Sequence, residues 1–87
     1  MSALAELNVY FLDVGQGDAA YIECDGHAMM IDGGNPGDSQ FIYSFLKKQT
    51  DHLETIIATH PHNDHVGGLP AAFKACSVDT LYTTCLV

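Results

Sequence analysis

Four potential metal ligands lie within six consecutive residues of the stretch ATHPHNDHVGGL, namely His60, His62, Asp64 and His65. The first three are each two residues apart, so in an extended backbone their side chains project to the same side. Imidazole nitrogens and carboxylate oxygens are suitable ligands for zinc, with manganese and iron as alternatives. The spacing predicts two adjacent divalent metal ions, the first held by His60 and His62 and the second by Asp64 and His65.

A solvated polar loop that is rich in histidine by chance is the alternative interpretation. The position of the loop favours the metal site, because the apolar segment LETIIATH leads directly into it and is typical of a buried strand. Ligands gather at the carboxyl ends of strands in α/β sheets. Gly67 and Gly68 follow the loop and would let the backbone approach the site. His27 and His52 lie elsewhere, and we expect both to be surface residues.

Three segments in the first part of the chain are typical of strands. They are residues 7–15 (LNVYFLDVG), 19–24 (AAYIEC) and 27–32 (HAMMID). Asp25 and Gly26 separate the last two segments and are the preferred pair for a two-residue type I′ turn. Residues 15–18 (GQGD) predict a sharp turn, because glycine adopts positive φ at little cost. A meander of three strands is therefore expected.

The second part of the chain alternates between helix and strand patterns. We expect helices over residues 39–50 and 69–76, and strands over residues 53–60 and 78–87. The first helix places its large apolar residues on one face, and Asp38 or Ser39 can cap its N-terminus. The resulting order, βββ-α-β-α-β, predicts a layered α/β (α+β) fold.

Composition limits the partners of this chain. It has three lysines, no arginine and eleven carboxylates in 87 residues, for a net charge of −8. Such a surface repels phosphate backbones and anionic lipid, so the charge does not support nucleic-acid binding unless bound cations offset it. Three cysteines without CxxC spacing, no signal-peptide pattern and no membrane-length apolar run predict a cytoplasmic protein without a membrane segment.

The histidine stretch and two upstream motifs together resemble a known family. Residues 60–65 (HPHNDH) resemble the H-x-H-x-D-H signature of the metallo-β-lactamase fold superfamily, and residues 29–34 (MMIDGG) resemble its strand that ends in a buried aspartate. More narrowly, residues 11–23 (FLDVGQGDAAYIE), followed by IDGG and THPHNDHVGGL, resemble the hydrolase domain of ComEC-type DNA-uptake proteins and their stand-alone relatives. The resemblance runs from Val9 to Leu69, with its motifs in the expected order.

This resemblance implies a role for each motif residue. The four loop ligands would bind two metal ions in the pairs given above, and Asp64 would also orient the nucleophile. Asp32 would hydrogen-bond the ligand loop from outside the metal shell and so orient it. The residues implied to line the mouth of the site are Asp13, Gln16 and Asp18. For Asp13 and Asp18 a plain turn-forming role is the alternative.

The activity implied by the resemblance is metal-assisted hydrolysis, in which two divalent cations, zinc or alternatively manganese or iron, activate a shared water. The ComEC-type motifs favour a phosphodiester substrate, DNA or a nucleotide. A thioester, a lactone or a lactam is the alternative substrate, because the same fold hosts many chemistries.

The ligand set of the family is only partly present in this chain. Complete members are longer and supply a third histidine for the first metal, a bridging aspartate and a last histidine for the second. After His65 this chain has no histidine, and its one later carboxylate is Asp79, at an expected strand start. Residues 1–87 are therefore predicted to be one partial domain, the N-terminal half of an αββα sandwich, inactive alone. The rival hypothesis is an interaction piece that self-associates or completes a partner through an exposed sheet face.

Overall fold

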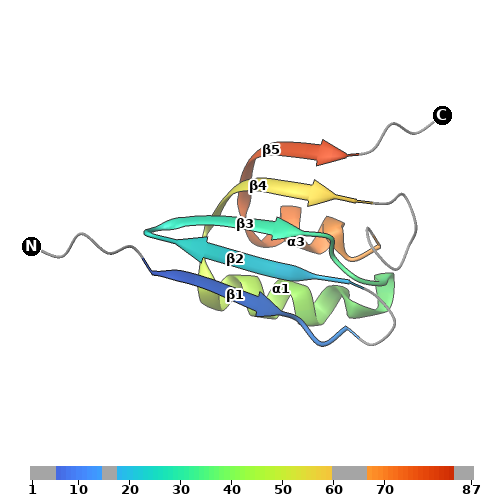
Figure 1. Cartoon of the computed structure of the whole chain (residues 1–87). Coiled ribbons are helices and arrows are strands. Elements are labelled where there is room, and N and C mark those ends of the chain that lie inside the picture. Colours follow the sequence, from blue (N-terminus) through green and yellow to red (C-terminus); the bar gives the residue numbers. More distant parts are fainter. Residues whose placement is uncertain (1–5, 15–17, 60–66, 84–87) are drawn as a thin grey trace, which may run out of the picture.

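The computed structural model describes residues 6–14, 18–59 and 67–83, and Figure 1 shows their arrangement. The elements are β1 (Leu7–Phe11), β2 (Ala20–Cys24), β3 (His27–Ile31), the 3-10 turn η1 (Pro36–Asp38), α1 (Ser39–Gln49), β4 (His52–Ala58), α3 (Leu69–Ala75) and β5 (Ser77–Thr83). This is the predicted order βββ-α-β-α-β. The boundaries differ from the predicted ones by a few residues, mainly because the first strand ends at Phe11. Residues 84–87 of the predicted last strand lie outside the described residues.

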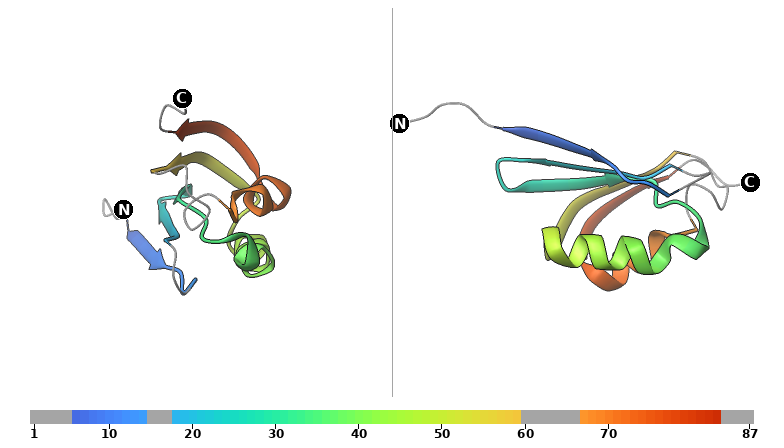
Figure 2. Two further views of the ribbon diagram at one scale, coloured as in Figure 1. Left: turned by 90° about the vertical axis from the view of Figure 1, so that its right-hand side faces the viewer. Right: turned by 90° about the horizontal axis from the view of Figure 1, so that it is seen from below.

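The five strands form one mixed sheet in the order β1-β2-β3-β4-β5. The first three strands pair antiparallel, whereas β4 pairs parallel with both β3 and β5. Parallel neighbours need a crossover connection. The described residues supply a helix for each of the two crossovers, α1 and α3, and Figure 2 shows both helices on the same face of the sheet. The predicted α/β class is confirmed.

The hairpin between β2 and β3 has the predicted turn. Asp25 has φ 52° and Gly26 has φ 84°, so both central residues are in the left-handed region that a type I′ turn requires. The pair Cys24 and His27 closes the ladder next to the turn. This turn fixes the register, and thereby decides which side chains of β2 and β3 face the helices.

The core lies between the sheet and the two helices. Its largest fully buried side chains are Tyr21, Met30, Ile42, Leu46, Leu53 and Ile56. Ile42 and Leu46 are four residues apart on α1, which puts them on one helical face. Ala72 and Ala75 are buried on α3, and their small side chains let this helix approach its neighbours closely.

One expectation about α1 was only partly right. Asp38 does occupy the N-cap position, but its carboxylate accepts a hydrogen bond from the backbone N–H of Asn35 at 2.9 Å and makes no capping bond to α1. The hydroxyl of Ser39 donates to the carbonyl oxygen of Pro36 at 2.7 Å. Both side chains therefore stabilise the 3-10 turn that precedes the helix.

The face of the sheet opposite α1 and α3 is apolar, and no described helix covers it (Figure 2). The strand registers place eight large apolar side chains on this open face: Leu7, Val9, Phe11, Ile22, Met29, Ile31, Ile57 and Tyr82. Several are well exposed, with Phe11 at 85% and Leu7 at 63%. Neither α1 nor α3 has the length and apolar character needed to cross a membrane, and they are the α-helices of the described residues.

Candidate functional site

Asp32 joins the end of β3 to the end of β4. It is 3% exposed and has φ 59°, an unusual conformation for a residue other than glycine. Its backbone N–H donates to the carbonyl oxygen of Ile57 at 2.8 Å. Its carboxylate accepts two hydrogen bonds from Thr59, one from the backbone N–H at 2.7 Å and one from the hydroxyl at 2.6 Å. Asp32 therefore fixes the residue that immediately precedes His60.

The residues after the histidine loop are held by the same segment. The backbone N–H of Gly68 donates to the carbonyl oxygen of Gly34 at 3.1 Å. A Cβ atom on Gly33 would lie 2.9 Å from the backbone nitrogen of Leu69, where α3 begins, so the two backbones are in direct contact. Residues 32–34 thus hold both flanks of the segment 60–66.

The predicted ligands themselves, His60, His62, Asp64 and His65, lie outside the described residues, as does Gln16. Their assignment as metal ligands and mouth residue stays a prediction. Within residues 6–14, 18–59 and 67–83, no group of three or more His, Cys, Asp or Glu side chains is arranged to hold a metal ion.

The two remaining mouth residues differ in their relation to Asp32. The carbonyl oxygen of Asp18 accepts a hydrogen bond from the backbone N–H of Gly34 at 2.9 Å, which brings Asp18 beside the segment 32–34. Asp13 is exposed beyond the end of β1. The structure therefore brings Asp18 to the candidate site, and Asp18 lines a cavity there that Asp13 does not line.

That cavity has a volume of about 360 Å³ and is open to solvent. It is lined by Phe11, Asp18, Ala19, Ala20, Ile31, Asp32 and Thr59. The sequence motifs did not identify Phe11 as a site residue. Phe11 is the first residue of the motif of residues 11–23, and a large aromatic side chain at that position was the available signal.

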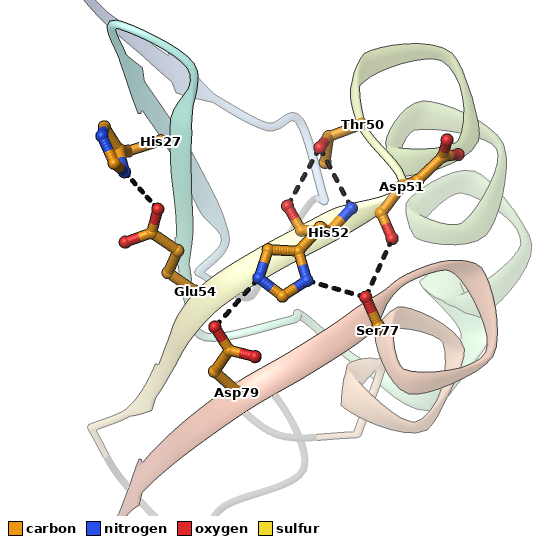
Figure 3. A network of polar contacts seen from close by, with 7 residues as sticks. All are labelled: His27, Thr50, Asp51, His52, Glu54, Ser77 and Asp79. Carbon is orange, nitrogen blue, oxygen red and sulfur yellow. Dashed lines mark hydrogen bonds and ion pairs between the residues drawn. The ribbon is translucent and has the colours of Figure 1, made fainter.

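A polar network lies at the N-terminal ends of β4 and β5, opposite the end of β4 that leads to Thr59 (Figure 3). His27 and His52 are both exposed, as predicted. Nδ1 of His27 contacts the carboxylate of Glu54, and this contact raises the pKa of His27. Nδ1 of His52 lies 2.7 Å from Oγ of Ser77, and its Nε2 lies 2.9 Å from a carboxylate oxygen of Asp79. These contacts connect the starts of neighbouring strands, at the other end of β4 from Thr59.

This chain is similar to proteins of a known family. The model of the Metallo-beta-lactamase superfamily matches residues 12–83. The hydroxyacylglutathione hydrolase of Vibrio parahaemolyticus serotype O3:K6 is 44% identical over 41 residues, which are 47% of this chain and 16% of that protein. The uncharacterized protein YcaI of Escherichia coli K12 is 42% identical over 69 residues, 74% of this chain and 9% of that protein.

A solved structure has the same fold over most of the chain. It was described as the first B3 metallo-beta-lactamase with an active site glutamic acid. The two share a TM-score of 0.61 and 29% sequence identity, and the match covers 82% of this chain and 29% of that one. In each of these comparisons the matched segment spans less than a third of the longer protein.

Proposed function

Because this chain belongs to the metallo-beta-lactamase superfamily, we propose that it is part of a metal-dependent hydrolase whose ligand loop is the segment 60–66. The observation that carries the proposal is the attachment of both flanks of this segment to residues 32–34. Ligands that must bind a metal in a fixed geometry need such support from the neighbouring structure. A polar loop without function would not require it.

The donor set of the loop fits divalent cations. Three imidazoles and one carboxylate within six residues suit zinc best, with manganese or iron as alternatives. In this proposal His60 and His62 hold one cation, while Asp64 and His65 hold the other. A bound divalent cation lowers the pKa of water toward 7 and polarises the scissile bond. Asp64 also orients the attacking water.

Asp32 is proposed to support the loop without itself binding a cation. Both of its carboxylate oxygens accept hydrogen bonds from Thr59, one residue before His60. A carboxylate that is engaged in this way sets the direction in which the following residue leaves β4. Asp18, which lines the same cavity, is proposed to contact the substrate.

A thioester is the substrate class that the named relatives favour. Two hydroxyacylglutathione hydrolases, from Vibrio parahaemolyticus and Albidiferax ferrireducens, are each 44% identical to this chain, over 41 and 51 residues. A phosphodiester is the second candidate, favoured by the resemblance of residues 11–23 to ComEC-type hydrolase domains. The lactam alternative has the support of the similar solved structure.

The remaining metal ligands are proposed to come from polypeptide beyond these 87 residues. This chain has three histidines and one aspartate in the loop and spans 16% of a hydroxyacylglutathione hydrolase. In this proposal the 87-residue chain alone is inactive, and the longer protein is cytoplasmic.

The test uses the full-length protein that contains this segment, loaded with zinc or manganese. Hydrolysis is measured with S-D-lactoylglutathione as a thioester, bis(4-nitrophenyl) phosphate as a phosphodiester and nitrocefin as a lactam. We expect His62→Ala and metal chelation each to lower the hydrolysis rate and the bound metal content together. His52→Ala is the matched control, because His52 is exposed at the start of β4, at the other end of the strand from Thr59. This variant should keep both the hydrolysis rate and the bound metal content. Undiminished hydrolysis after His62→Ala and chelation would refute the proposal.

A further inference from the structure

Phe11 has the largest exposed fraction, 85%, among the large hydrophobic side chains of the described residues. Val9, on the same strand and the same face, is 44% exposed. Exposed apolar surface of this kind is unfavourable in water, and large patches of it mark sites of interaction. The position of Phe11 therefore requires an explanation that is specific to the end of β1.

The cavity at the candidate site supplies one. Phe11 lines it together with Thr59 and Asp32. Thr59 is the last described residue before the proposed ligand loop. A group that lies against the ring of Phe11 is therefore next to the place where the loop begins.

The shape and polarity of the cavity define what kind of group fits. Ala20 is paired with Phe11 across the strands, and its small side chain leaves room beside the ring. Ile31, paired with Ala20, continues the apolar surface. The volume of about 360 Å³ is within the roughly 300–1,000 Å³ of ligand pockets. Two acidic residues, Asp18 and Asp32, share the lining, so a neutral group is favoured over an anion.

We propose that Phe11 is a specificity residue that packs against a neutral aromatic ring of the substrate, beside the bond that is hydrolysed. This proposal rests on the proposed hydrolase function. Two aromatic rings gain an edge-to-face or offset contact beyond the burial of their area, which an aliphatic group cannot provide. Substrates with an aromatic group beside the scissile bond are therefore preferred over their small aliphatic counterparts.

The rival explanation is that Phe11 is one more residue of the open face, covered by other polypeptide together with Val9. Val9 provides the matched control, because it lies two residues away on the same strand and face and does not line the cavity. If both residues belong to a covered sheet face, changing Phe11 and changing Val9 should have similar effects on substrate preference. A role in the cavity predicts an effect for Phe11 alone.

The experiment compares S-D-mandeloylglutathione with S-D-lactoylglutathione, two hydroxyacyl thioesters that differ by a phenyl group in place of a methyl group. The full-length, zinc-loaded protein is used, and the ratio of their kcat/KM values is measured. We expect Phe11→Ala to lower the mandeloyl-to-lactoyl ratio on the order of tenfold. Phe11→Leu should also lower this ratio, because it removes the ring. Phe11→Trp should retain most of the ratio, and Val9→Ala should leave it unchanged. Circular dichroism establishes that each variant is folded.

A binding measurement separates this proposal from the hydrolase function. Fluorine NMR of 4-fluorobenzyl alcohol, with trifluoroethanol as the non-aromatic control, reports aromatic binding by the metal-free full-length protein. Broadening of the 4-fluorobenzyl alcohol signal that disappears in Phe11→Ala supports the aromatic site. If this broadening is seen and neither thioester is hydrolysed, the thioester activity is overturned and the aromatic site stands. Hydrolysis with an unchanged substrate ratio in Phe11→Ala, or an equal change in Val9→Ala, would overturn the specificity role and leave the hydrolase function standing.

Discussion

The carbonyl oxygen of Gly33 lies 2.0 Å from the position that a Cβ atom on Gly68 would occupy. No side chain can start at that distance from an oxygen, so the close contact between the two backbones requires glycine at position 68. Gly33 follows the buried Asp32, and Gly68 is the residue directly before α3. The glycine after the loop thus lets the start of α3 approach the aspartate segment closely.

Gly68→Ala should therefore be strongly destabilising. The added methyl group meets backbone, which cannot rotate away, and forced overpacking of this kind costs about 1–3 kcal/mol or more in the free energy of unfolding. Gly37→Ala is the matched control, since nothing lies within 4 Å of its Cβ position, and a change within about 0.5 kcal/mol is expected there. Urea unfolding monitored by circular dichroism measures both. Equal stability of the two variants would show that the backbone contact is not required.

The bonds between Asp32 and Thr59 should affect metal binding without a direct metal contact. Thr59→Val keeps the shape of the side chain and removes the hydroxyl that donates to Asp32 at 2.6 Å. Loss of a supporting hydrogen bond of this kind lowers metal affinity by about 10–100-fold. Thr59→Ser keeps the hydroxyl and should retain most of the affinity. Zinc titration of the full-length variants by calorimetry is the measurement, and parental affinity in Thr59→Val would argue against the supporting role.

Local patterns were sufficient to predict most of the fold. The turn at Asp25 and Gly26 followed from the backbone conformations those residues adopt easily, and the helix at Ser39–Gln49 followed from its apolar periodicity. The contact of Gly33 with Gly68 could not be predicted, because it joins residues 35 positions apart and depends on how α3 docks. The exposure of Phe11 was missed for a related reason, since a strand pattern does not reveal which of its two faces the helices cover.

The contact of His27 with Glu54 should make stability depend on pH. The hydrogen bond and the charge of Glu54 raise the pKa of His27 in the folded protein above its ordinary value. The contact between the protonated imidazole and the Glu54 carboxylate therefore stabilises the fold fully below the ordinary histidine pKa. This contribution is lost as the pH rises through the raised pKa of the folded state. Because both side chains are exposed, the effect is small.

Glu54→Gln tests this coupling. Proton NMR should show the pKa of His27 falling toward its ordinary value in this variant, and the pH dependence of thermal unfolding above about pH 6 should become flatter. Asp79→Asn, which changes the contact of His52 instead, is the control and should leave the pKa of His27 unchanged. An unchanged titration of His27 in Glu54→Gln would mean that the contact does not form in solution.

The open face should make the isolated 87-residue chain self-associate. Val9 is near the middle of the antiparallel ladder and is paired with Ile22, so Val9→Lys places a charge within this apolar surface. Sedimentation equilibrium should show oligomers for the parent chain and a shift toward monomers for Val9→Lys. Tyr43→Lys, on an exposed position of α1, is the control and should not cause this shift.

Salt distinguishes apolar association from association through charge. Each copy carries a net charge of −8, so like-charge repulsion opposes contact between copies, and added salt screens that repulsion. The self-association of the parent chain should therefore strengthen between low and physiological salt, whereas oligomers held by ion pairs would weaken. A parent chain that stays monomeric at high salt would remove the open face as a surface for self-association.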